Sequence, residues 1–225
     1  MRHLLLAAGV AASLAGWARA EPAPPPTRTP SPADYSVCIQ PLGKPDASLM
    51  VTAIAGIEYI YGFTVRVLPR RELPRTAWYA PRKRWRADRL LDWLDANVVP
   101  SAHCNAVLGF TASDISTTKD RYPDWGVLGL GNLGGPSAVV SSYRMRGTTR
   151  RNRHARAVKV VNHELGHVLG LDHYIGPDKH CLMEDAAGTV LTVDHEDGRH
   201  CASDVAAIYR LHHFHIPNGG QTPPQ

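Results

Sequence analysis

Three histidines and one glutamate, placed within eleven residues, have the spacing of a metal site. Residues 163–173 read HELGHVLGLDH, which is the pattern H-E-x-x-H-x-x-G-x-x-H. Residues four apart lie on the same face of a helix. His163 and His167 can therefore each offer one ring nitrogen to a single zinc ion. Glu164 lies beside them on the helix and can reach a water molecule bound to that ion.

Gly170 and His173 extend the pattern from two ligands to three. Glycine adopts positive φ angles at little cost, so Gly170 can turn the chain where the helix ends and bring His173 back to the same ion. Three histidines leave the fourth tetrahedral position open, which is typical of a catalytic zinc site rather than a structural one. The alternative is a histidine-rich helix without a metal, but the long motif is far more specific than H-E-x-x-H alone. The long motif resembles the metzincin signature.

The first twenty residues predict a secretory signal peptide. Arg2 and His3 form a basic start, an apolar run covers residues 4–14, and Ala18-Arg19-Ala20 is a small-x-small cleavage site. The apolar run is short for a membrane span, so cleavage after Ala20 is favoured over an uncleaved anchor. The protein is therefore expected in the periplasm or outside the cell, with no membrane span after cleavage.

Removal of residues 1–20 leaves 205 residues, enough for one domain with a sizeable core. The net charge falls from +5 to +3, which gives little support for a polyanionic partner. Residues 21–32 are proline-rich and are predicted to be a disordered leader. They contain no cysteine, so they do not resemble a pro-segment that blocks zinc with a thiolate. A catalytic domain is expected over 33–216, divided near residue 170, with a loose tail over 217–225.

Hydrophobic periodicity predicts alternating strands and helices around the motif. The expected strands cover residues 35–39, 63–68, 104–111, 126–130 and 137–145. The expected helices cover 46–61, 87–96, a segment from about 152 through the motif, and 203–211. The first three elements, strand, helix and strand, indicate a parallel βαβ unit.

A glycine-rich segment over residues 124–135 contains one short apolar strand. A strand at a sheet edge beside the active helix can pair with an extended peptide. We predict that role for five residues: Gly126, Val127, Leu128, Gly129 and Leu130. The alternative is an ordinary edge strand that glycines protect from unwanted pairing.

The segment 70–89 carries seven arginines and one lysine, interleaved with Trp78, Tyr79 and Trp85. Such a pattern can bind nucleic acid. Glu72 and Asp88 interrupt the basic run, however, and the chain carries a predicted export signal. A solvated connection whose aromatic residues dock on the domain is therefore favoured, and no nucleic-acid partner is expected.

Four cysteines in an exported protein indicate disulfides. Four cysteines allow three pairings, of which Cys38–Cys104 and Cys181–Cys201 are predicted. Cys38 and Cys104 begin strands that would be parallel, and the second pair brackets the segment after the motif. The second disulfide would contribute about 3 kcal/mol. A zinc-thiolate role is disfavoured because the chain has no C-x-x-C pair.

The chain resembles the archaemetzincins over about residues 35–211. That family's pattern continues the histidine motif with a cysteine, four residues, C-x-M, seventeen residues and C-x-x-C. Here Cys181-Leu182-Met183 matches C-x-M, and residues 184–200 lead to Cys201. Three departures stand out: Tyr174 replaces the first cysteine, Asp204 replaces the last, and the loop before Cys181 is two residues longer.

In the family, those four cysteines hold a second, structural zinc. With two of them absent, a second zinc is not expected, and a Cys181–Cys201 disulfide is a sensible substitute in an oxidising compartment. The resemblance implies an α/β (α+β) metzincin-like fold: a twisted mixed sheet with an antiparallel edge strand, packed on helices that include the active-site helix, plus a small C-terminal subdomain. It also implies that Met183 forms the Met-turn beneath the zinc site.

The resemblance implies a monomeric zinc metallopeptidase with one catalytic ion and peptide or protein substrates. Glu164 would act as general base toward a zinc-bound water. The first alternative is a metzincin-fold protein that binds zinc and peptides with little or no proteolysis. The second is a matrixin-type peptidase, since Cys38 in CIQPLGKPD faintly resembles a cysteine switch. The strand pattern around Cys38 favours a disulfide instead.

Overall fold

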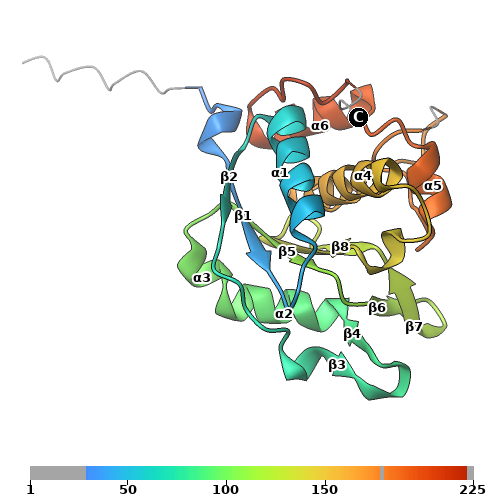
Figure 1. Cartoon of the computed structure of the whole chain (residues 1–225). Coiled ribbons are helices and arrows are strands. Elements are labelled where there is room, and N and C mark those ends of the chain that lie inside the picture. The colour runs from blue at the N-terminus through green and yellow to red at the C-terminus, as the bar shows by residue number, and fades with distance from the viewer. Residues whose placement is uncertain (1–28, 178–179, 222–225) are drawn as a thin grey trace, which may run out of the picture.

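The computed structural model describes residues 29–177 and 180–221. The predicted signal peptide and most of the predicted leader therefore lie outside the described residues. A five-stranded sheet with the order β2-β1-β5-β9-β8 forms the centre of the fold, and helices cover both of its faces (Figure 1). Its strands are β1 (Ser36–Pro41), β2 (Thr64–Val67), β5 (Ala106–Thr111), β8 (Gly129–Gly131) and β9 (Ser137–Ser141). All pairs are parallel except β8 with β9, so the predicted mixed sheet with an antiparallel edge strand is confirmed.

The alternation of side chains along the strands divides the core into two layers. Val37 and Ile39 of β1 contribute to the cluster under α1 (Ala47–Tyr61) and α4 (Arg150–Val168). Cys38, between them, faces the cluster on the opposite side of the sheet. That cluster lies under α2 (Ala87–Asn97) and α3 (Val99–Ala102). Helices therefore bury both faces of the sheet, and the sheet holds α4 in a fixed position.

Local sequence signals fix the ends of α1, whereas α4 starts earlier than predicted. Asp46 caps α1 by accepting hydrogen bonds from the amides of Ser48 and Leu49, and Gly62 ends it at φ 71°. The helix α4 is capped by Thr149 rather than opening near residue 152. Its first four residues, RRNR, contain no apolar side chain, so hydrophobic periodicity could not reveal the first turn.

A second, four-stranded sheet was not predicted. Its order is β3-β4-β6-β7, with β3 (Trp78–Tyr79), β4 (Arg84–Arg86), β6 (Ile115–Lys119) and β7 (Tyr122–Val127). It incorporates the arginine-rich segment, where Trp78 packs against Trp85 and Arg84 pairs with both Asp114 and Asp124. Part of that segment's charge is therefore neutralised within the fold.

The C-terminal region contains a short helix that was not predicted, α5 (Val190–His195), and the last helix, α6 (Ala202–His212). The cap of α6 is Cys201, whose amide donates a hydrogen bond to the Asp204 carboxylate, so the helix begins one residue before the predicted start at 203. The predicted strand over 137–145 also ends early, at Ser141, and a 3₁₀ turn follows it.

Two predictions of disorder are wrong at their inner ends. In the leader, Ser31 caps a 3₁₀ turn that begins at Pro32. In the tail, the side chain of Asn218 donates a hydrogen bond to the Tyr59 carbonyl at 2.8 Å, and the Gly219 carbonyl accepts one from the His200 amide at 2.7 Å. The described part of the tail is thus held against α1 by Asn218 and against the segment before α6 by Gly219. No helix within residues 29–177 and 180–221 has the length and apolarity needed to cross a bilayer.

Candidate zinc centre and substrate cleft

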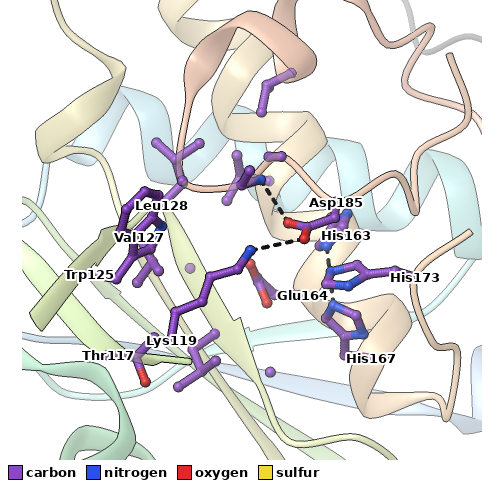
Figure 2. Close-up of a pocket in the computed structure, with 18 of the residues that line it drawn as sticks. Thr117, Lys119, Trp125, Val127, Leu128, His163, Glu164, His167, His173 and Asp185 are labelled. Carbon is purple, nitrogen blue, oxygen red and sulfur yellow. Dashed lines mark hydrogen bonds and ion pairs between the residues drawn. The ribbon is translucent and has the colours of Figure 1, made fainter. Parts of the chain in front are cut away.

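The three predicted ligand histidines converge on one point. His163 and His167 project from the last two turns of α4, and His173 returns from the turn that follows the helix (Figure 2). Their ligand atoms all lie within 4.8 Å of one another. The turn that returns His173 is made at Gly170, where φ is 90°. Gly170 and Leu171 donate amide hydrogen bonds back to the last carbonyls of the helix, which closes the turn.

Backbone carbonyls orient two of the three imidazoles. The Nδ1 atom of His163 donates to the Leu182 carbonyl at 2.7 Å, and Nδ1 of His167 donates to the Leu171 carbonyl at 2.8 Å. A carbonyl oxygen can only accept, so the proton of each ring lies on Nδ1. The Nε2 atoms are left unprotonated and directed toward the site, which is the arrangement that metal-binding histidines show in proteins.

This donor set fits a zinc ion. The Nε2 atoms of His163 and His167 are 3.1 Å apart, close to the roughly 3.3 Å expected for two nitrogens on one tetrahedral zinc with bonds of 2.0–2.1 Å. Burial, reinforced by the neighbouring His167, lowers the pKa of His163 to about 3, and burial also lowers the pKa of His167. Both rings are therefore neutral near pH 7, as metal ligation requires.

Glu164 lies beside the histidines and is buried against the edge strand β8. Burial raises the pKa of its carboxyl to about 8, although a hydrogen bond from the Gly131 amide opposes that shift. The close approach of strand and helix depends on glycine. A Cβ at Gly129 would lie 2.5 Å from Cγ of Glu164, and one at Gly131 would lie 2.6 Å from the backbone oxygen of Glu164.

Met183 lies directly beneath the motif helix. The side chain is fully buried, and a Cβ at Gly166 would lie 2.5 Å from its Sδ atom. The Met183 carbonyl also accepts a hydrogen bond at 2.7 Å from the amide of Tyr174, the residue after the third histidine. The predicted Met-turn residue thus occupies the floor below the ligands and is tied to the loop that carries His173.

The structure contains both predicted cysteine pairs, Cys38 with Cys104 and Cys181 with Cys201. Their Cα atoms are 5.9 and 5.4 Å apart, respectively. The first disulfide joins β1 to the segment before β5. The second disulfide, Cys181–Cys201, lies in the segment after the motif. Cys181 is followed directly by Leu182, whose carbonyl orients His163.

The predicted substrate strand is only partly correct. Gly126 and Val127 end β7 in the second sheet, while Gly129 and Leu130 belong to β8 at the edge of the central sheet. Leu128 lies between the strands, where the chain passes from one sheet to the other. Its carbonyl still accepts a hydrogen bond at 2.8 Å from Ser141. The edge strand beside Glu164 is therefore Gly129–Gly131, which begins three residues later than predicted and ends one residue later.

A cleft of about 430 Å³ opens between β8 and the histidines. Lys119 of β6 reaches across it to Asp185, with its Nζ atom 3.0 Å from the carboxylate (Figure 2). Sequence reasoning missed several lining residues, which come from β6 and from the C-terminal region. They include Lys119, Asp185, Val193 and Glu196. The one available signal was the three-residue spacing of Val193 and Glu196, which puts both on one side of a helical turn.

Comparison with known proteins gives a consistent result. No family model matches the chain. The archaemetzincin of Haloarcula marismortui is 31% identical over 176 residues, which cover 74% of this chain and 95% of the relative. The crystal structure of archaemetzincin from Methanopyrus kandleri superposes with a TM-score of 0.68 at 26% identity, covering 79% of this chain and 94% of that one.

A zinc-dependent peptidase from Methanocorpusculum labreanum also shares the fold, with a TM-score of 0.64 at 17% identity over 76% of this chain and 99% of that chain. The sequence match to Haloarcula marismortui spans nearly the whole relative and about three quarters of this chain. This chain therefore belongs to the archaemetzincin family.

Proposed function

We propose that this protein is a zinc-dependent peptidase that hydrolyses peptide bonds with Glu164 as general base. One observation supports this proposal above the others: a buried carboxyl lies beside three converging imidazoles in a cleft bordered by an edge strand. The archaemetzincin relatives and the fold shared with a zinc-dependent peptidase support it as well.

His163, His167 and His173 would hold one zinc ion. When bound, zinc supplies Lewis-acid chemistry, because it polarises the scissile carbonyl and lowers the pKa of water. Glu164 would take a proton from the attacking water and return it to the leaving amine. A carboxyl group within reach of the attacking water can carry the proton in both steps, first as base and then as acid. The backbone of β8 would align an extended substrate beside Glu164.

We further propose that the protein is exported and carries no second, structural zinc. The signal-peptide pattern of residues 1–20 supports export, and two disulfides are the usual state of cysteines in oxidising compartments. In the region where the family places its structural zinc, Cys181 is paired with Cys201 and Asp204 caps α6.

The test combines metal analysis with a variant that removes only the general base. Glu164→Gln keeps the size of the side chain and should lower kcat/KM on a peptide library by at least about 10³-fold, within the range of general acid–base effects. Zinc content should remain one ion per chain. Glu58→Gln, an exposed position on α1, is the matched control and should leave activity unchanged.

Each part of the proposal can fail separately. Full activity in Glu164→Gln would exclude this residue as the base. One zinc per chain with no cleavage of any library peptide by the unaltered protein would favour the binding-module alternative. Two zinc ions per chain would overturn the single-ion proposal, and mass mapping of the non-reduced protein would then show whether Cys181 and Cys201 are paired.

A further inference from the structure

The cleft extends beyond the histidines along the helix α4. Val160 lines it one helical turn before Glu164, on the same face of the helix. One turn rises 5.4 Å, so a side chain that enters beside Glu164 must be long to reach this end. Val193 and Glu196 line the cleft from the C-terminal region, and their carbonyls both contact Lys159, the residue before Val160. This part of the cleft is therefore partly apolar and contains one carboxyl.

Glu196 is a buried carboxyl group in the cleft lining. Its exposed fraction is 5%, and within the described ranges 29–177 and 180–221 no side chain or amide donates a hydrogen bond to the carboxylate. Burial raises the pKa of this carboxyl to about 8, with Glu184 acting in the same direction and Lys159 against it. A buried, unpaired carboxyl costs free energy, so a function for it in ligand binding is a physical reason for its place.

The nearest cation is engaged elsewhere. The ammonium of Lys159 donates to the carbonyl oxygens of Val193, at 2.8 Å, and of Glu196 itself. Arg156, one turn earlier on α4, is held by Asp194 through two hydrogen bonds of 2.7 and 2.6 Å. Both basic side chains thus fasten the α5 segment to α4. The charge of Lys159 partly offsets the burial of the Glu196 carboxylate, but Lys159 donates its hydrogen bonds to carbonyl oxygens and not to that carboxylate.

The remaining charges on the cleft lining are mainly acidic. Besides Glu164, the lining carries the carboxylates of Asp172, Asp185 and Glu196. Its one lysine within the described residues, Lys119, is paired with Asp185. A guest side chain with a positive tip next to Glu196 would favour the ionised form of that carboxyl and pair with it. An aliphatic stem would pack on Val160 and Val193, and the tip would reach Glu196.

We infer that Glu196 is a specificity-determining residue that selects substrates with lysine or arginine adjacent to the scissile bond. This inference rests on the proposed peptidase function. A long aliphatic side chain with a basic tip matches the apolar walls of the cleft and the carboxyl of Glu196 beyond them. A charged side chain of this kind forms charge-assisted hydrogen bonds with a carboxylate, and these are stronger than bonds between neutral groups.

The test uses two zinc-binding peptide hydroxamates that differ in one side chain, arginine or citrulline. Citrulline has nearly the shape of arginine but no charge. Calorimetric binding to the zinc-loaded protein should show at least tenfold tighter binding of the arginine compound. In Glu196→Gln that ratio should fall below about threefold, with citrulline affinity unchanged. Asp197→Asn, which alters the neighbouring carboxylate outside the cleft lining, should keep the original ratio.

Binding and cleavage together separate this inference from the proposed function. An arginine-to-citrulline ratio below threefold in the unaltered protein overturns the inference, whether or not Glu196→Gln folds. Peptide cleavage without a preference for basic residues next to the scissile bond does the same and leaves the proposed function standing. Selective binding of the arginine hydroxamate without cleavage of any peptide supports the specificity site and contradicts the peptidase proposal.

Discussion

The two sides of the cleft are built differently. Residues 29–170 form a layered sheet with helices on both faces, and this region supplies His163, His167 and Glu164 from one helix. The described residues 171–177 and 180–221 include two short helices joined by irregular segments, and they supply His173, Met183 and Glu196. The first region is held by apolar burial on both faces of the sheet and by one disulfide. The second adds a smaller set of buried apolar residues to one of those clusters, and it is also fastened by the other disulfide and by polar contacts from Arg156 and Lys159.

The difference assigns separate tasks to the two regions. A side chain on a helix that is packed against a sheet has little freedom, which suits the general base and the first two metal ligands. A region with few regular elements can vary in sequence and length at lower cost to the core. Under the proposed function, the layered region would supply the base and two metal ligands, whereas the C-terminal region would complete the metal site and select substrates.

The largest contrast should come from removing the two disulfides in turn. Changing Cys38 and Cys104 to serine should lower the free energy of unfolding by about 4 kcal/mol, and changing Cys181 and Cys201 should lower it by about 3 kcal/mol. Only the second change should also weaken zinc binding, by about 10–100-fold, because Leu182 next to Cys181 orients His163. Urea unfolding and zinc competition with a chelator would measure the two effects. Equal losses of zinc affinity would contradict the division of tasks.

The glycines of β8 should be nearly as sensitive. Gly131→Ala places a Cβ 2.6 Å from the backbone oxygen of Glu164 and 2.9 Å from Cβ of His167. Overpacking of this kind should cost about 1–3 kcal/mol of unfolding free energy and should displace Glu164, which lowers kcat. Gly220→Ala meets no atom within 4 Å and is the matched control. Thermal unfolding and peptide cleavage would measure both effects, and an unchanged melting temperature with unchanged cleavage in Gly131→Ala would contradict this prediction.

The buried carboxyl of Glu196 should make stability depend on pH. Its folded pKa is about 8, whereas an unfolded glutamate titrates near about 4.3. Between those values the folded state binds one proton more than the unfolded state. The contribution of Glu196 to stability is therefore fully present below about pH 4.3 and is lost as the pH rises through about 8. The loss should be about 1 kcal/mol per pH unit or less. Glu196→Gln should abolish this contribution in urea unfolding series at pH 5 to 8. Asp197→Asn should retain it, and an unchanged slope in Glu196→Gln would contradict the assignment.

The smallest effect on stability is expected at the ion pair across the cleft. Lys119 and Asp185 have side-chain exposures of 37% and 47%, so Lys119→Met should change the free energy of unfolding by less than about 1 kcal/mol. Removing the pair opens the cleft and should change KM more than stability. Steady-state kinetics and thermal unfolding would compare the two. A large fall in melting temperature would show that the pair holds the two regions together.

Prediction from sequence succeeded where one local signal determines the structure. Hydrophobic periodicity predicted the active-site helix, and the predicted range 46–61 agrees with α1 to within one residue. The second sheet was missed because its strands are short and partly exposed, so strand periodicity is weak there. The chain's change of sheet at Leu128 follows from tertiary packing, which no local pattern encodes.

Within the site, the same distinction applies. The convergence of the three histidines beside Glu164 was predictable because helical spacing places His163, Glu164 and His167, and a glycine turn of fixed length returns His173. Glu196 was not, because it becomes part of the cleft only when α5 docks on Arg156 and Lys159 of α4. Long-range docking of this kind leaves little trace in the sequence beyond the spacing of Val193 and Glu196.

The carbonyl contacts of His163 and His167 make part of the site indifferent to residue type. Every amino acid at position 171 or 182 brings a carbonyl oxygen, so a substitution there alters packing but leaves the acceptor in place. A change in chain length is different, because deleting one residue between His173 and Leu182 would move the second acceptor away from its ring. The orientation of the His163 ring therefore depends on the number of residues between His173 and Leu182 more than on their identities. Substitution scanning would overlook it, and deletion scanning would reveal it.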